Sequence, residues 1–325
     1  MKEHHDPEIY RPGSRPRSLG SAVFRGLASS VKGFFLLAAT AVPVHLLVTA
    51  AEWSGILGRL SEPLNGAAAV FGLPGKAAVV VLASVFLNLY GAVAAVAALG
   101  LNLRVMTIVA VMALMAHNLA LESALMKRTG SSASKMMLTR LVWAILAGLA
   151  LNRILPATSH WLIVPEPLAA ENLGALIAAW APDALRLVGT MAALLLSLRL
   201  IRAVLEEFVV LELLTKVVAP FLRVFGLPSR ESVPWMLANT ASYGAASKLL
   251  DERIKAGEMK KQEADLFNHH AAVCHGLYED TAMFMLIGVS LFWLTVPRLA
   301  IALVVVWFER ARRHRFRRSF KVGTV

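Results

Sequence analysis

Long apolar segments recur along the chain. Residues 77–103 and 105–116 contain no Asp, Glu, Lys, Arg or His, and residues 33–44, 187–198 and 281–296 share this property. Apolar runs that approach about 20 residues are typical of helices that cross a bilayer. A soluble helical protein with several fully buried helices is the alternative, and it does not account for so many uncharged runs. The pattern therefore predicts an all-α integral membrane protein.

The chain contains an internal repeat, with copy one at residues 33–155 and copy two at residues 185–309. Three short anchors occur in both copies in the same order, and this shared order is stronger evidence for a repeat than any single match. The anchors are VFGLP at 70–74 and 224–228, Tyr-Gly-Ala at 90–92 and 243–245, and a histidine motif at 117–124 and 275–282.

Charge predicts which loops face the cytoplasm. The net charge is +12, and the basic residues gather near the chain ends, so we interpret them as topology anchors and expect no nucleic-acid partner. The tails at 1–32 and 310–325 and the loops at 127–135 and 251–261 are therefore predicted to be cytoplasmic, and the first tail to be disordered. Residues 156–184 carry acidic residues and no Lys or Arg, which predicts a periplasmic loop.

Copy one must begin in the cytoplasm and end in the periplasm, and copy two must do the reverse. Each copy therefore crosses the membrane an odd number of times. Residues 76–99 must then form a re-entrant hairpin, with residues 229–248 as its counterpart. Three crossings per copy place copy two upside down relative to copy one, which is the inverted-repeat plan of many secondary transporters. An amphipathic stretch at 206–226 is predicted to lie in the membrane interface, a cytosolic linker helix being the alternative. The predicted crossings are 33–51, 104–126 and 136–155 in copy one and 185–205, 265–294 and 297–309 in copy two.

The histidine motif places ionisable residues inside apolar segments twice. His117 in HNLALESALM matches His275 in HGLYEDTAMF, and Glu122 matches Asp280. An ionisable side chain in a membrane helix costs about 2.5–3.5 kcal/mol on insertion scales, and it usually faces the bundle interior beside a partner. Inversion would bring both motifs to one central region, so we predict a shared polar site there. The alternative for Glu122 is a position at the cytoplasmic interface near Lys127, and the alternative for Asn118 and Ser123 is hydrogen bonding between packed helices.

Helical spacing predicts which of these residues share a face. If each segment is a continuous helix, Asn118 lies on the same face as Glu122, and Asn268, His275 and Glu279 form one stripe. Such a stripe would present polar groups to the bundle interior rather than to lipid.

The re-entrant tips supply neutral hydrogen-bonding groups. Gly91 and Gly244 are predicted at the turns, because glycine tolerates backbone angles that a Cβ makes costly. Nearby amides and hydroxyls would bind a polar ligand, or they would satisfy one another. The predicted substrate-binding residues are Asn88, Tyr90, Gly91, His117, Asn118, Glu122, Asn239, Thr240, Ser242, Tyr243, Gly244, Asn268, His275, Glu279, Asp280 and Thr281.

Signals for metal, cofactor or catalytic chemistry are weak in this sequence. His269, His270, Cys274 and His275 form HHxxxCH, yet only His270 and Cys274 have i, i+4 spacing, and the chain has no second cysteine. The sequence contains no Walker A, GxGxxG or paired-cysteine zinc pattern. We therefore expect no metal site, no cofactor and no enzyme activity.

HGLYEDT resembles the His-x-x-x-Glu-Asp-Thr signature of the nucleoside-recognition, or Gate, family of membrane proteins, and the preceding Tyr-Gly-Ala tips add to the likeness. In copy one, Leu121 replaces the first acid of the Glu-Asp pair. The resemblance implies two Gate-like repeats and a nucleoside as the solute. Together with the inverted repeat, it predicts a transporter of a small polar solute in which the buried acids couple transport to protons or sodium. We also expect a bacterial-type inner membrane protein, and the basic chain ends predict that both termini are cytoplasmic.

Related modules in the same family imply two alternatives. One is a non-transporting assembly protein, like the spore-maturation relatives, with a homo-oligomer or another membrane protein as its partner. The other is a pathway for ferrous iron or another divalent metal, which would use His275 and Cys274.

Overall fold

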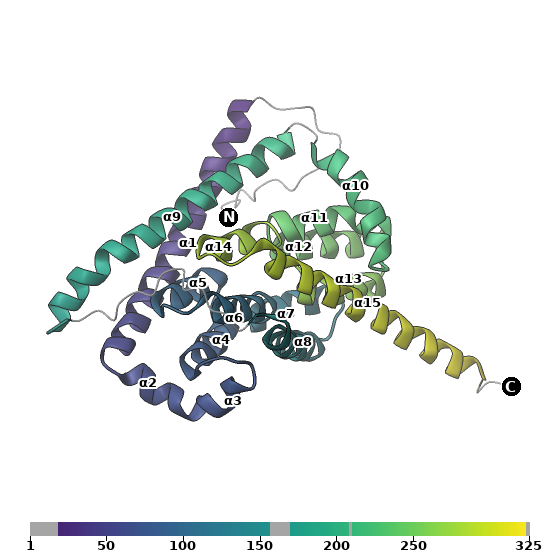
Figure 1. The fold of residues 1–325 in the computed structure, drawn as a ribbon. Helices are drawn as coiled ribbons and strands as arrows, with labels where there is room; N and C mark the ends of the chain where they lie inside the picture. The colour runs from purple at the N-terminus through teal and green to yellow at the C-terminus, as the bar shows by residue number, and fades with distance from the viewer. Residues whose placement is uncertain (1–18, 157–169, 208–209, 323–325) are drawn as a thin grey trace, which may run out of the picture.

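The structure is a computed structural model that describes residues 19–156, 170–207 and 210–322. All regular elements in these ranges are α-helices or short 3-10 helices, and the described chain has no strand (Figure 1). Within these ranges, five segments are long and apolar enough to cross a membrane: Leu19–Trp53, Leu103–Arg128, Ala133–Ile154, Leu173–Val204 and Leu291–Arg315. The prediction of an all-α membrane protein is confirmed.

Two copies of one helical module follow each other along the chain. Each begins with a 35-residue helix and continues through short helices, a hairpin pair, a broken helix and a final long helix. Copy one consists of α1 (Leu19–Trp53), α2 (Ile56–Ser61), η1 (Glu62–Leu64), α3 (Asn65–Ala69), α4 (Gly75–Phe86), α5 (Leu89–Ala98), α6 (Leu103–Ala116), α7 (Leu119–Arg128) and α8 (Ala133–Ile154). Copy two consists of α9 (Leu173–Glu207), α10 (Val210–Val224), η2 (Ser229–Glu231), α11 (Ser232–Thr240), α12 (Tyr243–Lys255), α13 (Lys261–Val273), α14 (Glu279–Leu286) and α15 (Leu291–Val322).

The VFGLP anchors of the two copies lie at opposite ends of α8. In copy one, Asn152 Nδ2 near the end of α8 donates to Val70 O at 3.0 Å. In copy two, the anchor accepts a hydrogen bond from Trp307 of α15, close to the point where Glu309 Oε2 lies 3.0 Å from Lys135 Nζ at the start of α8. At 1.5 Å per residue, about 25 Å of helix separates the two ends. This placement fits an inverted pair of repeats.

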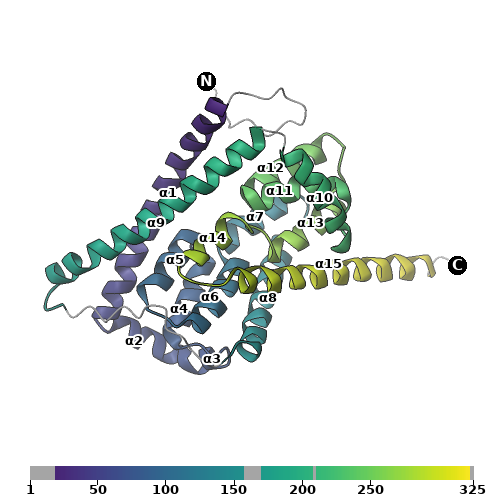
Figure 2. The same cartoon turned by 45° about the horizontal axis from the view of Figure 1, so that its top comes forward.

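Small side chains let α1 and α9 pack side by side (Figures 1 and 2). Gly26 and Ser30 are buried on one face of α1, and a Cβ on Gly26 would press against Leu200 of α9. Close backbone approach at small residues is a common packing device in membranes. Because this face continues toward the N-terminus, α1 begins at Leu19. The prediction of a disordered tail over 1–32 is therefore wrong from residue 19 onward, and its first 18 residues lie outside the described residues.

Two other predicted boundaries are also wrong. α9 begins at Leu173, so the predicted loop 156–184 is helical over its last part, while most of its first part lies outside the described residues. α15 is one helix, so the predicted crossing 297–309 is only its middle, and the predicted tail 310–325 is helical as far as Val322. Arg312 and Arg313 pair with the buried Glu309, which lies three and four residues earlier in α15. These pairs stabilise the extension of the helix.

The predicted crossings 104–126 and 265–294 are not continuous helices. The first is broken between α6 and α7 at residues 117–118, and the second between α13 and α14 at residues 274–278. Non-helical backbone at membrane depth persists only where protein or trapped water satisfies its polar groups. Here other helices provide the partners, as described below.

The breaks change which side chains share a face. Asn118 is the N-cap of α7, with a left-handed backbone, so it does not lie on a common helical face with Glu122. Asn268 lies in α13, His275 in the break and Glu279 at the start of α14, so the predicted stripe is wrong. The polar residues instead surround the breaks.

Candidate functional site

The two histidine motifs meet in the centre of the molecule. His117 Nε2 lies 3.4 Å from Glu122 Oε1, and His275 Nε2 lies 3.3 Å from both oxygens of the same carboxylate. The two imidazole rings have centroids 5.6 Å apart. All three side chains are buried. A carboxylate of copy one is thus held between histidines from both copies.

Each of the two histidine motifs lies at a helix break, and each break contains a residue with a left-handed backbone. Asn118 has φ 48° and Gly276 has φ 63°, and Asn and Gly are the residues that adopt this left-handed backbone at least cost. The Asn118 N–H donates to Ser84 O and Leu87 O at the end of α4. The Gly276 N–H donates to Ala238 O near the end of α11. In each copy, therefore, the end of the first hairpin helix satisfies the backbone of the broken helix.

Two fully buried arginines hold the breaks in place. Arg140 of α8 donates through Nη2 to His117 O at 2.8 Å and through Nε to Met115 O at 2.9 Å. Arg298 of α15 donates through Nη1 to His275 O at 2.9 Å. Both arginines have 0% exposed surface. Each guanidinium satisfies a motif-histidine carbonyl that the broken helix leaves free.

The sequence analysis missed these arginines, although a signal was present. Each lies 23 residues after the motif histidine of its copy and is followed by leucine. Their environments differ in one respect. Arg140 Nη2 lies 2.7 Å from Glu122 Oε2, whereas Arg298 Nη2 donates to Thr281 Oγ1 at 2.7 Å. Copy one therefore contains a buried ion pair where copy two contains a neutral contact.

The acids of copy two lie beside this centre, in a more open position. Asp280 Oδ2 is 4.0 Å from His117 Nε2, and its side chain is 22% exposed. Glu279 Oε1 accepts from the Tyr90 hydroxyl at 2.6 Å and lies 3.5 Å from Arg199 Nη2 of α9. A tip residue of copy one, an acid of copy two and a long-helix arginine thus form one cluster. Arg199 is a third arginine that was not among the predicted site residues.

Most of the predicted tip groups are used within the protein. Asn88 caps α5 by accepting from Gly91 N, and Ser242 caps α12 by accepting from Ala245 N. Asn239 Oδ1 accepts from Leu277 N, and the Thr240 hydroxyl donates to a carbonyl one turn earlier. The hairpin tips are therefore held by their own hydrogen bonds rather than presenting an open ring of donors.

The predicted glycine turns are wrong. Gly91 lies within α5 and Gly244 within α12, and neither has a positive φ. The first chain reversal occurs in extended backbone at Leu87 and Asn88, which needs no special residue, and the second ends at Ser242. A side chain on Gly91 would instead meet neighbouring apolar groups.

Asn268 and Tyr243 form a separate, fully satisfied network. The Tyr243 hydroxyl donates to Asn268 Oδ1 at 2.6 Å. Asn268 Nδ2 donates to Thr129 Oγ1 at 2.8 Å and to Ser131 Oγ at 2.9 Å. These bonds connect α13 to the connection between α7 and α8. Both residues are on the predicted list, and their geometry fits a role in joining the two copies.

Metal-ligand geometry is present at the centre, but the charges oppose a cation. The ligand atoms of His117, Glu122 and His275 lie within 4.8 Å of one another. Arg140 already pairs with the carboxylate, and its positive charge would repel a metal ion there. A second group, around His269, has its carboxylates paired with Lys and Arg side chains. Among the described residues, Cys274 belongs to neither group.

His270 has a structural partner rather than a metal-like setting. Its Nε2 accepts from Trp235 Nε1 at 3.0 Å, and its ring stacks on Phe225 at 4.9 Å between centroids. The HHxxxCH stretch therefore does not converge on one point.

Comparison with known proteins gives a relative but no family. No family model and no solved structure matches the chain. The chain is 24% identical to the uncharacterized membrane protein YvoD of Bacillus subtilis (strain 168) over 285 residues, which are 86% of this chain and 91% of that protein. This similarity agrees with the helical architecture: the chain is a multi-helix membrane protein.

Proposed function

We propose that the protein is an ion-coupled transporter of a small polar solute and that the coupling ion is the proton. The observation that supports this best is the position of Glu122, between His117 of its own copy and His275 of the other. In inverted-repeat transporters, one repeat rocks against the other around a central site. Such a motion would change the contact between Glu122 and His275 while leaving the contact with His117 intact.

The hydrogen bonds of the two histidines define where a proton can move. His117 Nδ1 faces Ala113 O at 3.1 Å, and His275 Nδ1 faces Ala271 O at 2.6 Å. A carbonyl can only accept, so each Nδ1 carries the hydrogen and each Nε2 is the nitrogen that gains or loses a proton. Both Nε2 atoms face Glu122. A proton on either Nε2 therefore lies beside the same carboxylate, which connects the two copies.

A row of titratable groups leads from this site toward solvent-accessible surface. Glu122 and His117 are 11% and 6% exposed, Asp280 is 22% exposed, and Glu279 is 15% exposed beside Arg199. Protons move readily between such groups, whereas sodium requires oxygen ligands free of competing cations. Arg140 already neutralises Glu122. Arg140 therefore opposes a sodium ion at Glu122, and the histidine Nε2 atoms rather than Glu122 would carry a coupling proton.

The nature of the solute rests on the resemblance to Gate proteins, which implies a nucleoside. We also propose a bacterial-type inner membrane, with both termini in the cytoplasm because the basic residues gather near the chain ends. A non-transporting assembly role remains the second candidate, because the tip groups are satisfied within the protein.

Transport by proteoliposomes tests the proposal. We expect an imposed pH gradient to drive uptake of at least one labelled nucleoside, and Glu122→Gln to abolish this uptake while the protein still folds. Glu258→Gln is the matched control, because Glu258 is an exposed acid away from the centre. Uptake driven by a sodium gradient alone would refute proton coupling. Uptake of Fe²⁺ without any nucleoside would support the metal pathway, and no uptake at all would favour assembly.

A further inference from the structure

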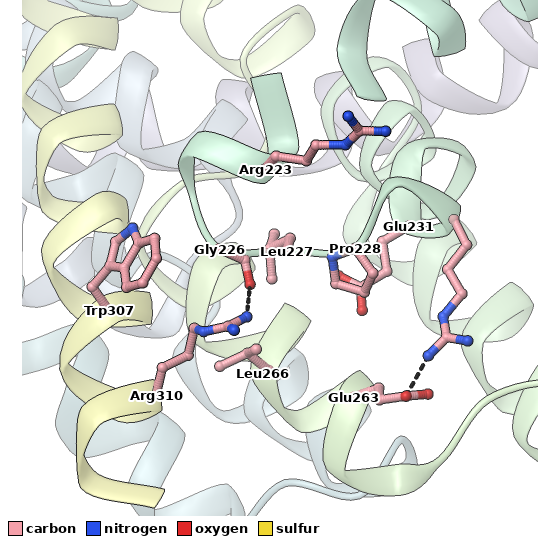
Figure 3. A pocket seen from close by; sticks show the side chains of 10 residues that line it. Arg223, Gly226, Leu227, Pro228, Glu231, Glu263, Leu266, Trp307 and Arg310 are labelled. Atoms are coloured by element: carbon pink, nitrogen blue, oxygen red, sulfur yellow. Dashed lines mark hydrogen bonds and ion pairs between the residues drawn. The ribbon is translucent and has the colours of Figure 1, made fainter. Parts of the chain in front are cut away.

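A pocket of about 450 Å³ lies apart from the central site, where the end of α10 meets α13 and α15 (Figure 3). The copy-two VFGLP anchor forms one wall, and Leu266 and Arg310 lie across from it. The charged lining residues are Arg223, Arg230, Glu231, Glu263 and Arg310.

Two of the three pocket arginines have no carboxylate partner. Arg230 pairs with Glu263. Arg223 Nε donates to Ser229 Oγ at 2.9 Å, and Arg310 Nη1 donates to Gly226 O at 2.5 Å. Among the described residues, no carboxylate oxygen lies within 4.0 Å of either of these two arginines, so their positive charge is available to an anion.

Glu231 does not cancel that charge at neutral pH. Its side chain is fully buried, and neither carboxyl oxygen has a hydrogen-bond partner in the described chain. Burial raises the pKa of Glu231 to about 8; the charge of Arg230 opposes the rise and that of Glu263 adds to it. The carboxyl group is therefore mostly protonated at pH 7 and adds little negative charge beside the pocket arginines.

Copy one supplies an internal comparison, and its equivalent place is filled. Arg310 follows Arg298 by 12 residues, as Asn152 follows Arg140. Asn152 bonds to Arg104 and to the copy-one anchor, and both side chains lie against Gly72. The residue three positions after the anchor proline is Glu231 in copy two but a buried alanine in copy one. Copy two thus carries Arg310 and Glu231 at two positions where copy one carries Asn152 and Ala77.

An exposed apolar stripe on α10 leads to this pocket. Leu213, Val217, Phe221 and Val224 recur at steps of three or four residues, so they share one face, and all four are exposed. Trp307, at the pocket edge, is also exposed. A helix with such a face is suited to lie in the membrane interface, where tryptophan is enriched. A ligand whose polar group occupies the pocket would therefore lie next to the acyl-chain region of the membrane.

We propose that this pocket binds the phosphate group of an anionic phospholipid, with Arg223 and Arg310 as the phosphate ligands and the α10 stripe against the acyl chains. Guanidinium groups form strong charge-assisted hydrogen bonds with phosphate. Basic pockets between membrane helices are known to select anionic headgroups. The pocket lies near the N-terminal end of α8, whereas the copy-one anchor lies near the C-terminal end of that helix. The proposed lipid site does not depend on the proposed transport activity.

Thermal unfolding of the purified full-length chain in detergent tests the site. We expect phosphatidylglycerol to raise Tm more than phosphatidylcholine, and Arg223→Gln/Arg310→Gln to lose that difference. The matched control is Arg59→Gln/Arg153→Gln, which removes two exposed arginines elsewhere and should keep the full response. Because Arg310 also bonds to Gly226, Arg223→Gln alone is included and should lose at least half of the difference between the two lipids.

Three results would overturn the proposal. The first is an equal response of the wild type to both lipids. The second is an undiminished phosphatidylglycerol response in both pocket variants. The third is an equal stabilisation by inorganic phosphate or glycerol phosphate at matched concentration, which would assign the site to a free phosphate instead of a lipid.

Discussion

Removal of Arg140 should be the most costly single change at the centre while Glu122 remains. Arg140 is fully buried, lies 2.7 Å from Glu122 Oε2, and bonds to the carbonyls of Met115 and His117. Removing one partner of a buried ion pair costs about 3–5 kcal/mol, because the other charge is left uncompensated. For Arg140→Met, we therefore expect the free energy of unfolding to fall by about 3–5 kcal/mol.

A double-mutant cycle separates the ion pair from the two carbonyl bonds. Arg140→Met/Glu122→Gln should cost less than the sum of the single changes by about 1–3 kcal/mol, because the unpaired charge is gone. Unfolding by denaturant in mixed micelles measures each free energy. Arg298→Met is the matched control, since Arg298 bonds to two carbonyls and a hydroxyl and should show little coupling to Glu122. Additivity of Arg140 and Glu122 within about 0.5 kcal/mol would refute this interpretation of the pair.

Three further predictions concern other parts of the molecule. The folded protein keeps a proton on Glu231 between its ordinary pKa of 4.5 and about 8, whereas the unfolded chain releases it. Stability should therefore fall by up to about 1.4 kcal/mol per pH unit across this window, and a Tm series from pH 5 to 9 should show this slope reduced in Glu231→Gln. Gly276→Ala should lower stability by at least about 1–2 kcal/mol in denaturant titration, because the residue has φ 63° and a Cβ would overlap the Asp280 carboxylate; unchanged stability would contradict that backbone. In a cysteine-free background, an impermeant thiol reagent outside intact cells should label Glu171→Cys but not Ser134→Cys, and equal labelling would refute the charge-based topology.

The apolar pattern and the repeat were sufficient to predict the helical membrane architecture. Uncharged runs specify helices locally, because a bilayer leaves the backbone no other way to satisfy its own hydrogen bonds. The order of the anchors predicted two copies of one module, and the two histidine motifs predicted a common central site. His117, Glu122 and His275 do come together there. These inferences succeeded because they depend on composition and on symmetry between copies.

The tertiary structure alone decided where the helices break and how the charges pair. The breaks at Asn118 and Gly276 depend on hydrogen bonds to the ends of α4 and α11, which are distant in sequence. No periodicity within 104–126 or 265–294 reports such partners, so continuous helices were predicted. Arg140 lies on a different helix from Glu122, and the cost of burying two charges becomes acceptable only where packing brings them within 2.7 Å. The same holds for the pocket of copy two, whose arginines and buried glutamate come from segments that only the fold places side by side.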